Sequence, residues 1–164
     1  MIHQLASLPP EERAKKQREY ALVEAFLVRA AEFRGWQFSF FDENPDLVYE
    51  RDGEQLGFES VVIAPDDAAA DCFFDANRCE LRVPSLDSHE RLTLVQAALM
   101  QHLLDHLRHY KLPTVIVLTI TDDTVNLSEL AKNLRLPELK AENIRDYYLT
   151  HAHGVYKVRE TQPL

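Results

Sequence analysis

Apolar residues near the start of the chain recur at the three- and four-residue spacing of an amphipathic helix. Pro10 suits the start of this helix and Gly35 its end, so the pattern predicts a helix over residues 10–34. Glu19 lies four residues before Val23 and falls on the apolar face, so its carboxylate is expected to point inward. The apolar positions of that face are Val23, Phe26, Leu27, Ala30 and Phe33.

The next elements are a strand over residues 36–41 and a β-hairpin. Asp52-Gly53 between two apolar runs is a strong hairpin signal, because a type I′ turn needs positive φ at both central residues. With these residues as the loop, the strands cover 46–50 and 54–63, and paired residue numbers sum to 105. Asp46 is then directly opposite Glu59, with Cβ atoms about 4.5–5.5 Å apart. Like charges this close are destabilising unless a cation lies between them.

The second strand of the hairpin is largely apolar on both faces, which is typical of a central strand covered on both sides. Glu59 therefore lies where an unpaired carboxylate is costly. One face carries Gly57, Glu59, Val61 and Ile63, and the other carries Leu56, Phe58, Ser60 and Val62.

The remaining pattern completes an α/β arrangement. Residues 64–88 are irregular and acidic, with a short strand at 79–83. A leucine stripe predicts a helix over 88–110, and the β-branched run at 114–120 predicts a buried strand. After it we expect helices at 128–134 and 141–150 and a last short strand at 154–159.

Composition limits the choice of function. The 164 residues, 46% hydrophobic and 27% charged, are typical of one soluble globular domain. The formal charge of −9 disfavours nucleic acid or anionic membrane as a partner, because Lys and Arg supply most of that affinity. The cluster Arg13, Lys15, Lys16 and Arg18 still allows a local basic groove. The sequence shows no secretory signal and no apolar run of the ~18 residues that a membrane span needs, so we expect the cytoplasm.

Two other kinds of site are weaker alternatives. His102 and His106 are four residues apart on the helix predicted over 88–110, with Asp105 and His109 beside them, and such a pair can share a zinc ion. A zincin motif would place Glu after the first His, where this chain has Leu103, and half-exposed neighbours on a helix explain the spacing equally well. A nucleotide-binding P-loop is excluded, because the chain has four glycines and no glycine-rich loop.

The predicted elements follow in the order helix, strand, strand with Pro45-Asp46, strand with Gly57-Phe58-Glu59, helix and buried strand. This order and its two motifs resemble the PD-(D/E)XK nuclease superfamily over roughly residues 11–121. The resemblance implies a restriction-endonuclease-like fold, a mixed sheet flanked by helices with an α-β-β-β-α-β core. The sequence pattern adds a helical extension over 122–164. It implies that Asp46 and Glu59 bind Mg²⁺ or Mn²⁺ and that Glu19 assists catalysis. The activity implied is Mg²⁺-dependent hydrolysis of a phosphodiester.

One position departs from the family's pattern. The lysine expected two residues after the strand acid is replaced by Val61, which can neither orient a water nor stabilise charge on a phosphate. We therefore expect cleavage to be weak or absent. The alternative is a catalytically inactive interaction module or homo-oligomeric scaffold, which the lost lysine and the acidic composition favour. The opposed acids favour the enzyme, because a scaffold has no evident use for their repulsion.

Overall fold

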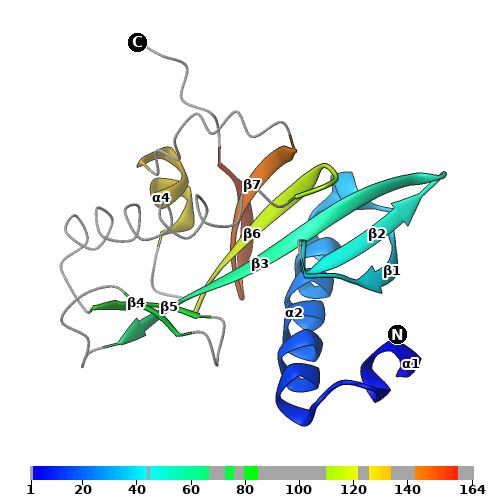
Figure 1. The fold of residues 1–164 in the computed structure, drawn as a ribbon. Helices are drawn as coiled ribbons and strands as arrows, with labels where there is room; N and C mark the ends of the chain where they lie inside the picture. Colours follow the sequence, from blue (N-terminus) through cyan, green and yellow to red (C-terminus); the bar gives the residue numbers. More distant parts are fainter. Residues whose placement is uncertain are drawn as a thin grey trace.

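The computed structural model describes residues 2–43, 45–66, 73–75, 80–84, 110–121, 126–133 and 143–158. These residues form one α/β domain, in which an open mixed sheet is covered by the long helix α2 on one face (Figure 1). The α/β class and the mixed sheet flanked by helices are confirmed. The helix predicted over 88–110, with His102, Asp105, His106 and His109, lies outside the described residues except for Tyr110.

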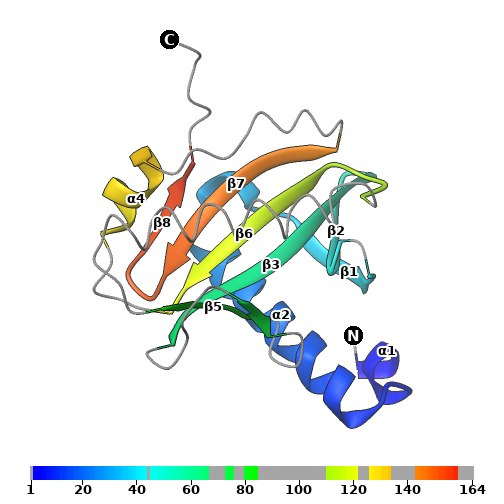
Figure 2. The ribbon, with the colours of Figure 1, turned by 60° about the vertical axis from the view of Figure 1, so that its left-hand side comes forward.

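The described strands join in one sheet of eight, whose main order is β1-β2-β3-β6-β7-β8. Strand β3 is antiparallel to β2 and parallel to both β5 and β6, and β4 pairs with β5. Figure 2 shows β3, β6, β7 and β8 side by side. In chain order the elements are α1 (Ile2–Ala6), α2 (Pro10–Arg29), the 3₁₀ turn η1 (Ala31–Phe33), β1 (Gln37–Phe41), β2 (Leu47–Arg51), β3 (Glu54–Asp66), β4 (Phe73–Asp75), β5 (Glu80–Pro84), β6 (Thr114–Ile120), α4 (Leu127–Asn133), β7 (Ile144–His151) and β8 (Gly154–Lys157).

The hairpin prediction is confirmed. Asp52 and Gly53 have φ of 54° and 83°, as a type I′ turn requires. The pairing runs from Arg51 with Glu54 to Leu47 with Phe58, so paired residue numbers sum to 105 along its whole length.

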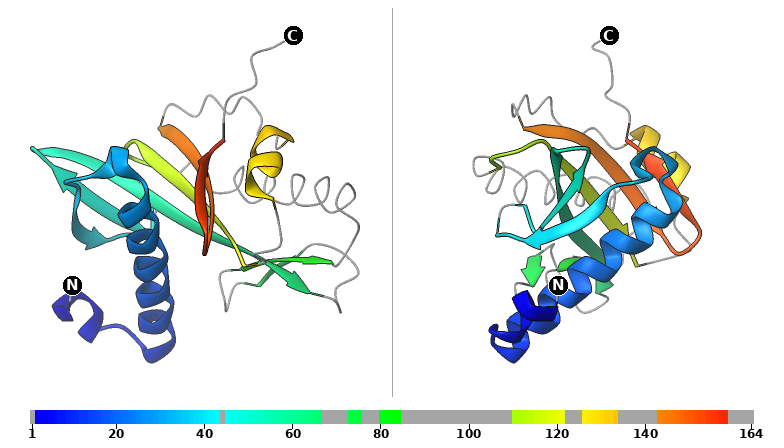
Figure 3. Two further views of the ribbon diagram at one scale, coloured as in Figure 1. Left: turned by 180° about the vertical axis from the view of Figure 1, so that it is seen from behind. Right: turned by 90° about the vertical axis from the view of Figure 1, so that its right-hand side faces the viewer.

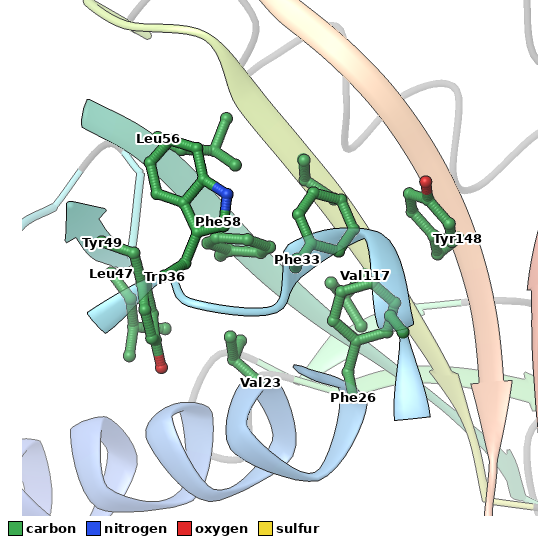
Figure 4. Close-up of a cluster of buried hydrophobic side chains, with 12 residues drawn as sticks. Val23, Phe26, Phe33, Trp36, Leu47, Tyr49, Leu56, Phe58, Val117 and Tyr148 are labelled. Atoms are coloured by element: carbon green, nitrogen blue, oxygen red, sulfur yellow. The ribbon is translucent and has the colours of Figure 1, made fainter. Parts of the chain in front are cut away.

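The sheet separates two apolar layers, as the two apolar faces of β3 predict. Under α2, Val23 and Phe26 point toward Phe58 and Val117 of the sheet (Figure 4). On the opposite face, Leu127 of α4 belongs to a second cluster with Val61 and Ile63. Figure 3 shows α2 and α4 on different sides of the sheet. Because both faces of β3 are covered, polar side chains near its middle are buried.

Two helix predictions are wrong. The first helix ends at Arg29 and not at residue 34, because Ala30 leaves the helical conformation at φ −92° and ψ 87°. The chain then turns through η1, which lets Phe33 pack edge-on against Phe58. Burial of that aromatic ring outweighs the helical spacing of the apolar residues.

The predicted helix over 141–150 is instead strand β7, which runs parallel to β6 from Ile144 to Thr150. Its residues Tyr148, Leu149 and Thr150 are buried in succession, which a helix with one apolar face does not allow. Pairing with β7 also satisfies the backbone groups along the second edge of β6. The predicted helical extension thus contains two strands, while α4 and β8 agree with the predictions at 128–134 and 154–159.

Candidate carboxylate site

A gap in the pairing along one edge of β3 forms the base of the site. Strand β2 pairs with β3 as far as Phe58, and β5 begins to pair with it at Val62. Both strands lie on the edge opposite β6, which pairs with β3 through the whole interval. The three residues Glu59, Ser60 and Val61 therefore lie between β2 and β5, and their outward backbone groups need other partners.

Asp46 and Glu59 fill this gap with their carboxylates. Asp46 is the residue before β2, so the hairpin register brings it beside Glu59 as predicted. Its backbone N–H donates to Glu59 Oε2 at 3.2 Å, and its own Oδ2 accepts the backbone N–H of Ser60 at 3.2 Å. Each side chain thus caps a backbone group that no neighbouring strand satisfies. Asp46 and Glu59 are both 6% exposed.

Helix α2 brings a buried cation to the same place. The Lys16 ammonium lies 3.8 Å from Asp46 Oδ1 and 3.6 Å from Glu19 Oε2, and it donates to the backbone carbonyl of Asp42 at 2.6 Å. Lys16 is 7% exposed and Glu19 3%. The half-exposed Lys15 also lies 3.6 Å from Glu19. The inward direction of Glu19 was predicted correctly.

The sequence analysis placed Lys16 in a basic surface cluster and missed its buried position. A signal was present, because Lys16 lies three residues before Glu19 and seven before Val23, on the same face of the helix. Two other basic residues of that cluster have partners away from the carboxylates. Arg13 donates to the carbonyls of Ala6 and Leu8, and Arg18 lies 3.8 Å from Glu80.

Burial is the main influence on the acidity of the pair. It raises the pKa of Asp46 to about 7, helped by the charge of Glu19 and opposed by Lys16, the Ser60 N–H and Lys15. Burial, then the charge of Asp46, raises the pKa of Glu59 well above its usual value. Without a further cation, the pair therefore retains a proton near neutral pH.

The oxygen atoms of the site fit a hard divalent cation. Asp46 and Glu59 bring two carboxylates together, and Glu19 Oε2 is buried without a hydrogen-bond donor. Within the described ranges, no three His, Cys, Asp or Glu side chains converge as a metal site. Mg²⁺ is usually bound in this way, by one or two carboxylates and several waters.

Val61 lies on the same face of β3 as Glu59 and is 1% exposed within the apolar cluster under α4. The strand therefore brings no ammonium to this position. Tyr110 belongs to the same cluster, and its buried hydroxyl has no hydrogen-bond partner among the residues that the structure describes. The sequence analysis did not single out Tyr110, which it placed at the end of a helix.

Comparisons with family models, curated protein sequences and solved structures find no match to this chain. Among the described helices, none is long and apolar enough to cross a membrane. The functional argument therefore rests on the geometry of the carboxylate site.

Proposed function

We propose that this chain is a divalent-metal-dependent phosphodiesterase of the PD-(D/E)XK type, with Asp46 and Glu59 as the ligands of Mg²⁺ or Mn²⁺. The observation that carries the proposal is the buried pair of opposed carboxylates in the gap between β2 and β5. The order α2, β1, β2, β3 and the parallel placement of β6 beside β3 support a restriction-endonuclease-like core. The chain has a net negative charge, which disfavours nucleic acid overall. Binding of a nucleic-acid substrate would therefore depend on local contacts.

Lys16 offers the positive charge that Val61 cannot. In the resembled superfamily the lysine follows the strand acid by two residues, whereas here an ammonium reaches the Asp46 carboxylate from helix α2. A buried ammonium at this position would stabilise charge that develops on a phosphoryl oxygen, and low solvent exposure strengthens that interaction. Glu19 holds Lys16 in place through their 3.6 Å contact.

A bound Mg²⁺ would lower the pKa of a coordinated water and bind a phosphoryl oxygen. The protein's own contribution is positional. The backbone N–H groups of Asp46 and Ser60 fix the two carboxylates in the gap, so little reorientation is needed when a cation binds. Lys16 donates to the Asp42 carbonyl, which holds its side chain at the edge of the site.

The test is cleavage of labelled DNA and RNA in the presence of Mg²⁺ or Mn²⁺. We expect weak metal-dependent cutting by the wild-type chain, none by Asp46→Asn, and at least a roughly tenfold loss in Lys16→Met. Lys15→Met is the matched control, because Lys15 also contacts Glu19 but is half-exposed, and it should retain cutting. Cutting that survives in Asp46→Asn would come from another site or a contaminant. Metal binding without any cutting would contradict the enzymatic proposal.

One observation favours the second candidate, an inactive interaction module or scaffold. The carboxylates of Asp46 and Glu59 already accept backbone hydrogen bonds across the gap, so they have a structural use without a metal. Asp46→Asn separates the two functions, because the amide oxygen can still accept the Ser60 N–H while the charge is lost. If the protein binds no metal and Asp46→Asn is as stable as wild type, the carboxylates act as backbone caps and the scaffold becomes the better explanation.

A further inference from the structure

The Lys16 ammonium has more hydrogen-bond donors than the described residues use. An ammonium carries three N–H groups, and one of them donates to the Asp42 carbonyl at 2.6 Å. Its other polar neighbours are Glu19 Oε2 at 3.6 Å and Asp46 Oδ1 at 3.8 Å. A direct bond between an ammonium and a carboxylate is about 2.7–2.9 Å long, so both contacts are too long to be hydrogen bonds. Two N–H groups of Lys16 are therefore left over, although its side chain is buried.

Glu19 has the complementary defect on the same helix. Its Oε2 atom is buried, and no described residue donates a hydrogen bond to it. The side chain is 3% exposed, so bulk water does not supply the missing donor. A buried carboxylate oxygen without a donor costs free energy, and such atoms usually have a partner. Spare donors on Lys16 and a spare acceptor on Glu19 thus lie 3.6 Å apart without a direct bond.

An ordered water at this place would satisfy all three side chains. Polar groups more than about 3.5 Å apart are often bridged by a water. This water would accept an N–H of Lys16 and donate to Glu19 Oε2 and Asp46 Oδ1, which are the roughly three hydrogen bonds that a buried water usually makes. Oδ1 is the oxygen of Asp46 that remains, because Oδ2 already accepts the Ser60 N–H.

We propose that Lys16, Glu19 and Asp46 bind one ordered water between helix α2 and the edge of β3, and that Glu19 is a positioning residue that acts on Asp46 through this water. The Ser60 N–H on Oδ2 and the water on Oδ1 then fix the orientation of the Asp46 carboxylate. A carboxylate that binds a metal is commonly held by such outer hydrogen bonds, and their loss weakens metal binding. The role in cation binding rests on the proposed function, whereas the water site does not.

The first experiment detects the water in the metal-free wild-type protein by NMR of isotope-labelled lysine side chains. We expect the ammonium protons of Lys16 to exchange slowly and to give a cross-peak with water whose sign indicates direct contact and not proton exchange. Lys15 is the internal control, because it also lies 3.6 Å from Glu19 but is half-exposed, so its protons should show only fast exchange. A Lys16 ammonium without a contact to water would overturn the water site.

Two variants test whether Glu19 holds the water. Glu19→Gln and Glu19→Met both remove the charge, but only Gln keeps an oxygen that can accept a hydrogen bond. We expect the cross-peak between Lys16 and water to persist in Glu19→Gln and to disappear in Glu19→Met. The same result in both variants would overturn the role of Glu19. If Glu19→Met does not fold, the wild-type spectrum still decides whether the water is bound.

A calorimetric titration with Mn²⁺ tests the positioning role. We expect the affinity of Glu19→Met for Mn²⁺ to be roughly tenfold lower than that of Glu19→Gln, because only Met loses the outer hydrogen bond. The comparison cancels the loss of charge, which the two variants share. Equal affinities would overturn the positioning role. A bound water in a wild-type protein that binds no Mn²⁺ would leave the water site standing and contradict the proposed function instead.

Discussion

The ammonium of Lys16 lies 3.8 Å from the carboxylate of Asp46 and joins helix α2 to the gap in the sheet edge. Both side chains are buried, so their charges interact with little screening by water. The contact gives the carboxylate site one internal cation beside Asp46, Glu59 and Glu19. The stability of the site and its capacity for a further cation therefore depend on Lys16.

Removal of the buried charge should destabilise the fold. Lys16→Met leaves the surrounding carboxylates without that counter-ion, and breaking a buried ion pair costs about 3 kcal/mol. Urea denaturation at pH 8 measures the loss, which should shrink at pH 5 because the carboxyl groups take up protons. Lys15→Met should cost at most about 1 kcal/mol, because its partially exposed pair is screened by solvent. Equal losses in the two variants would contradict a special role for Lys16.

The stability of the metal-free protein should fall as the pH rises. The pKa of Asp46 is about 7 in the fold, and an unfolded Asp has a pKa near 4, so the native state binds more protons between these values. Stability contributed by the protonated pair is therefore present at low pH and lost between about pH 4 and 7, with a total change of roughly 2–4 kcal/mol. Denaturation from pH 5 to 8 measures this slope. In Asp46→Asn the slope should flatten, and an identical slope would contradict the assignment.

The close approach of Pro45 to the second hairpin strand should make any side chain at position 57 destabilising. A Cβ at Gly57 would lie 2.3 Å from Pro45 Cγ and 2.8 Å from Thr114 Oγ1. Gly57→Ala should therefore cost about 1–3 kcal/mol, as overpacked sites do, and should shift the adjacent Asp46. The control is Gly53→Asn, with φ of 83° and no atom within 4 Å of a Cβ, which should cost less than about 1 kcal/mol. Thermal unfolding of both variants makes the comparison.

Replacement of Val61 by lysine tests whether the missing motif lysine limits cleavage. Val61→Lys would bring an ammonium to the same strand face as Glu59, two residues along, where it could orient a water and offset charge on a phosphate. We expect more metal-dependent cleavage than in wild type, together with lower stability, because Lys enters an apolar layer. The double variant Val61→Lys/Asp46→Asn should not cut. Robust cutting by wild type, equal to that of Val61→Lys, would show that Val61 does not weaken the site.

The hairpin could be predicted because its register depends on local chemistry. The Asp52-Gly53 turn determines which residues of the two strands face each other. Counting outward from the turn along both strands therefore brings Asp46 beside Glu59. Ala30 and strand β7 were mispredicted because packing against other elements outweighs local spacing at both places. Tyr110 was not singled out, because no local pattern in the sequence indicates that its hydroxyl is buried without a partner among the described residues.

The most direct test of the central claim is thermal unfolding with and without millimolar Mg²⁺ or Mn²⁺. Ligands that bind only the native state raise the melting temperature by mass action. We expect the metals to stabilise the wild-type chain and to have no effect on Asp46→Asn or Glu59→Gln, each of which keeps its shape and loses one carboxylate. In the absence of metal, Glu59→Gln should leave the melting temperature unchanged or raise it, because a like charge beside Asp46 is removed. A melting temperature that does not respond to metal in any of the three proteins would contradict a metal site at Asp46 and Glu59.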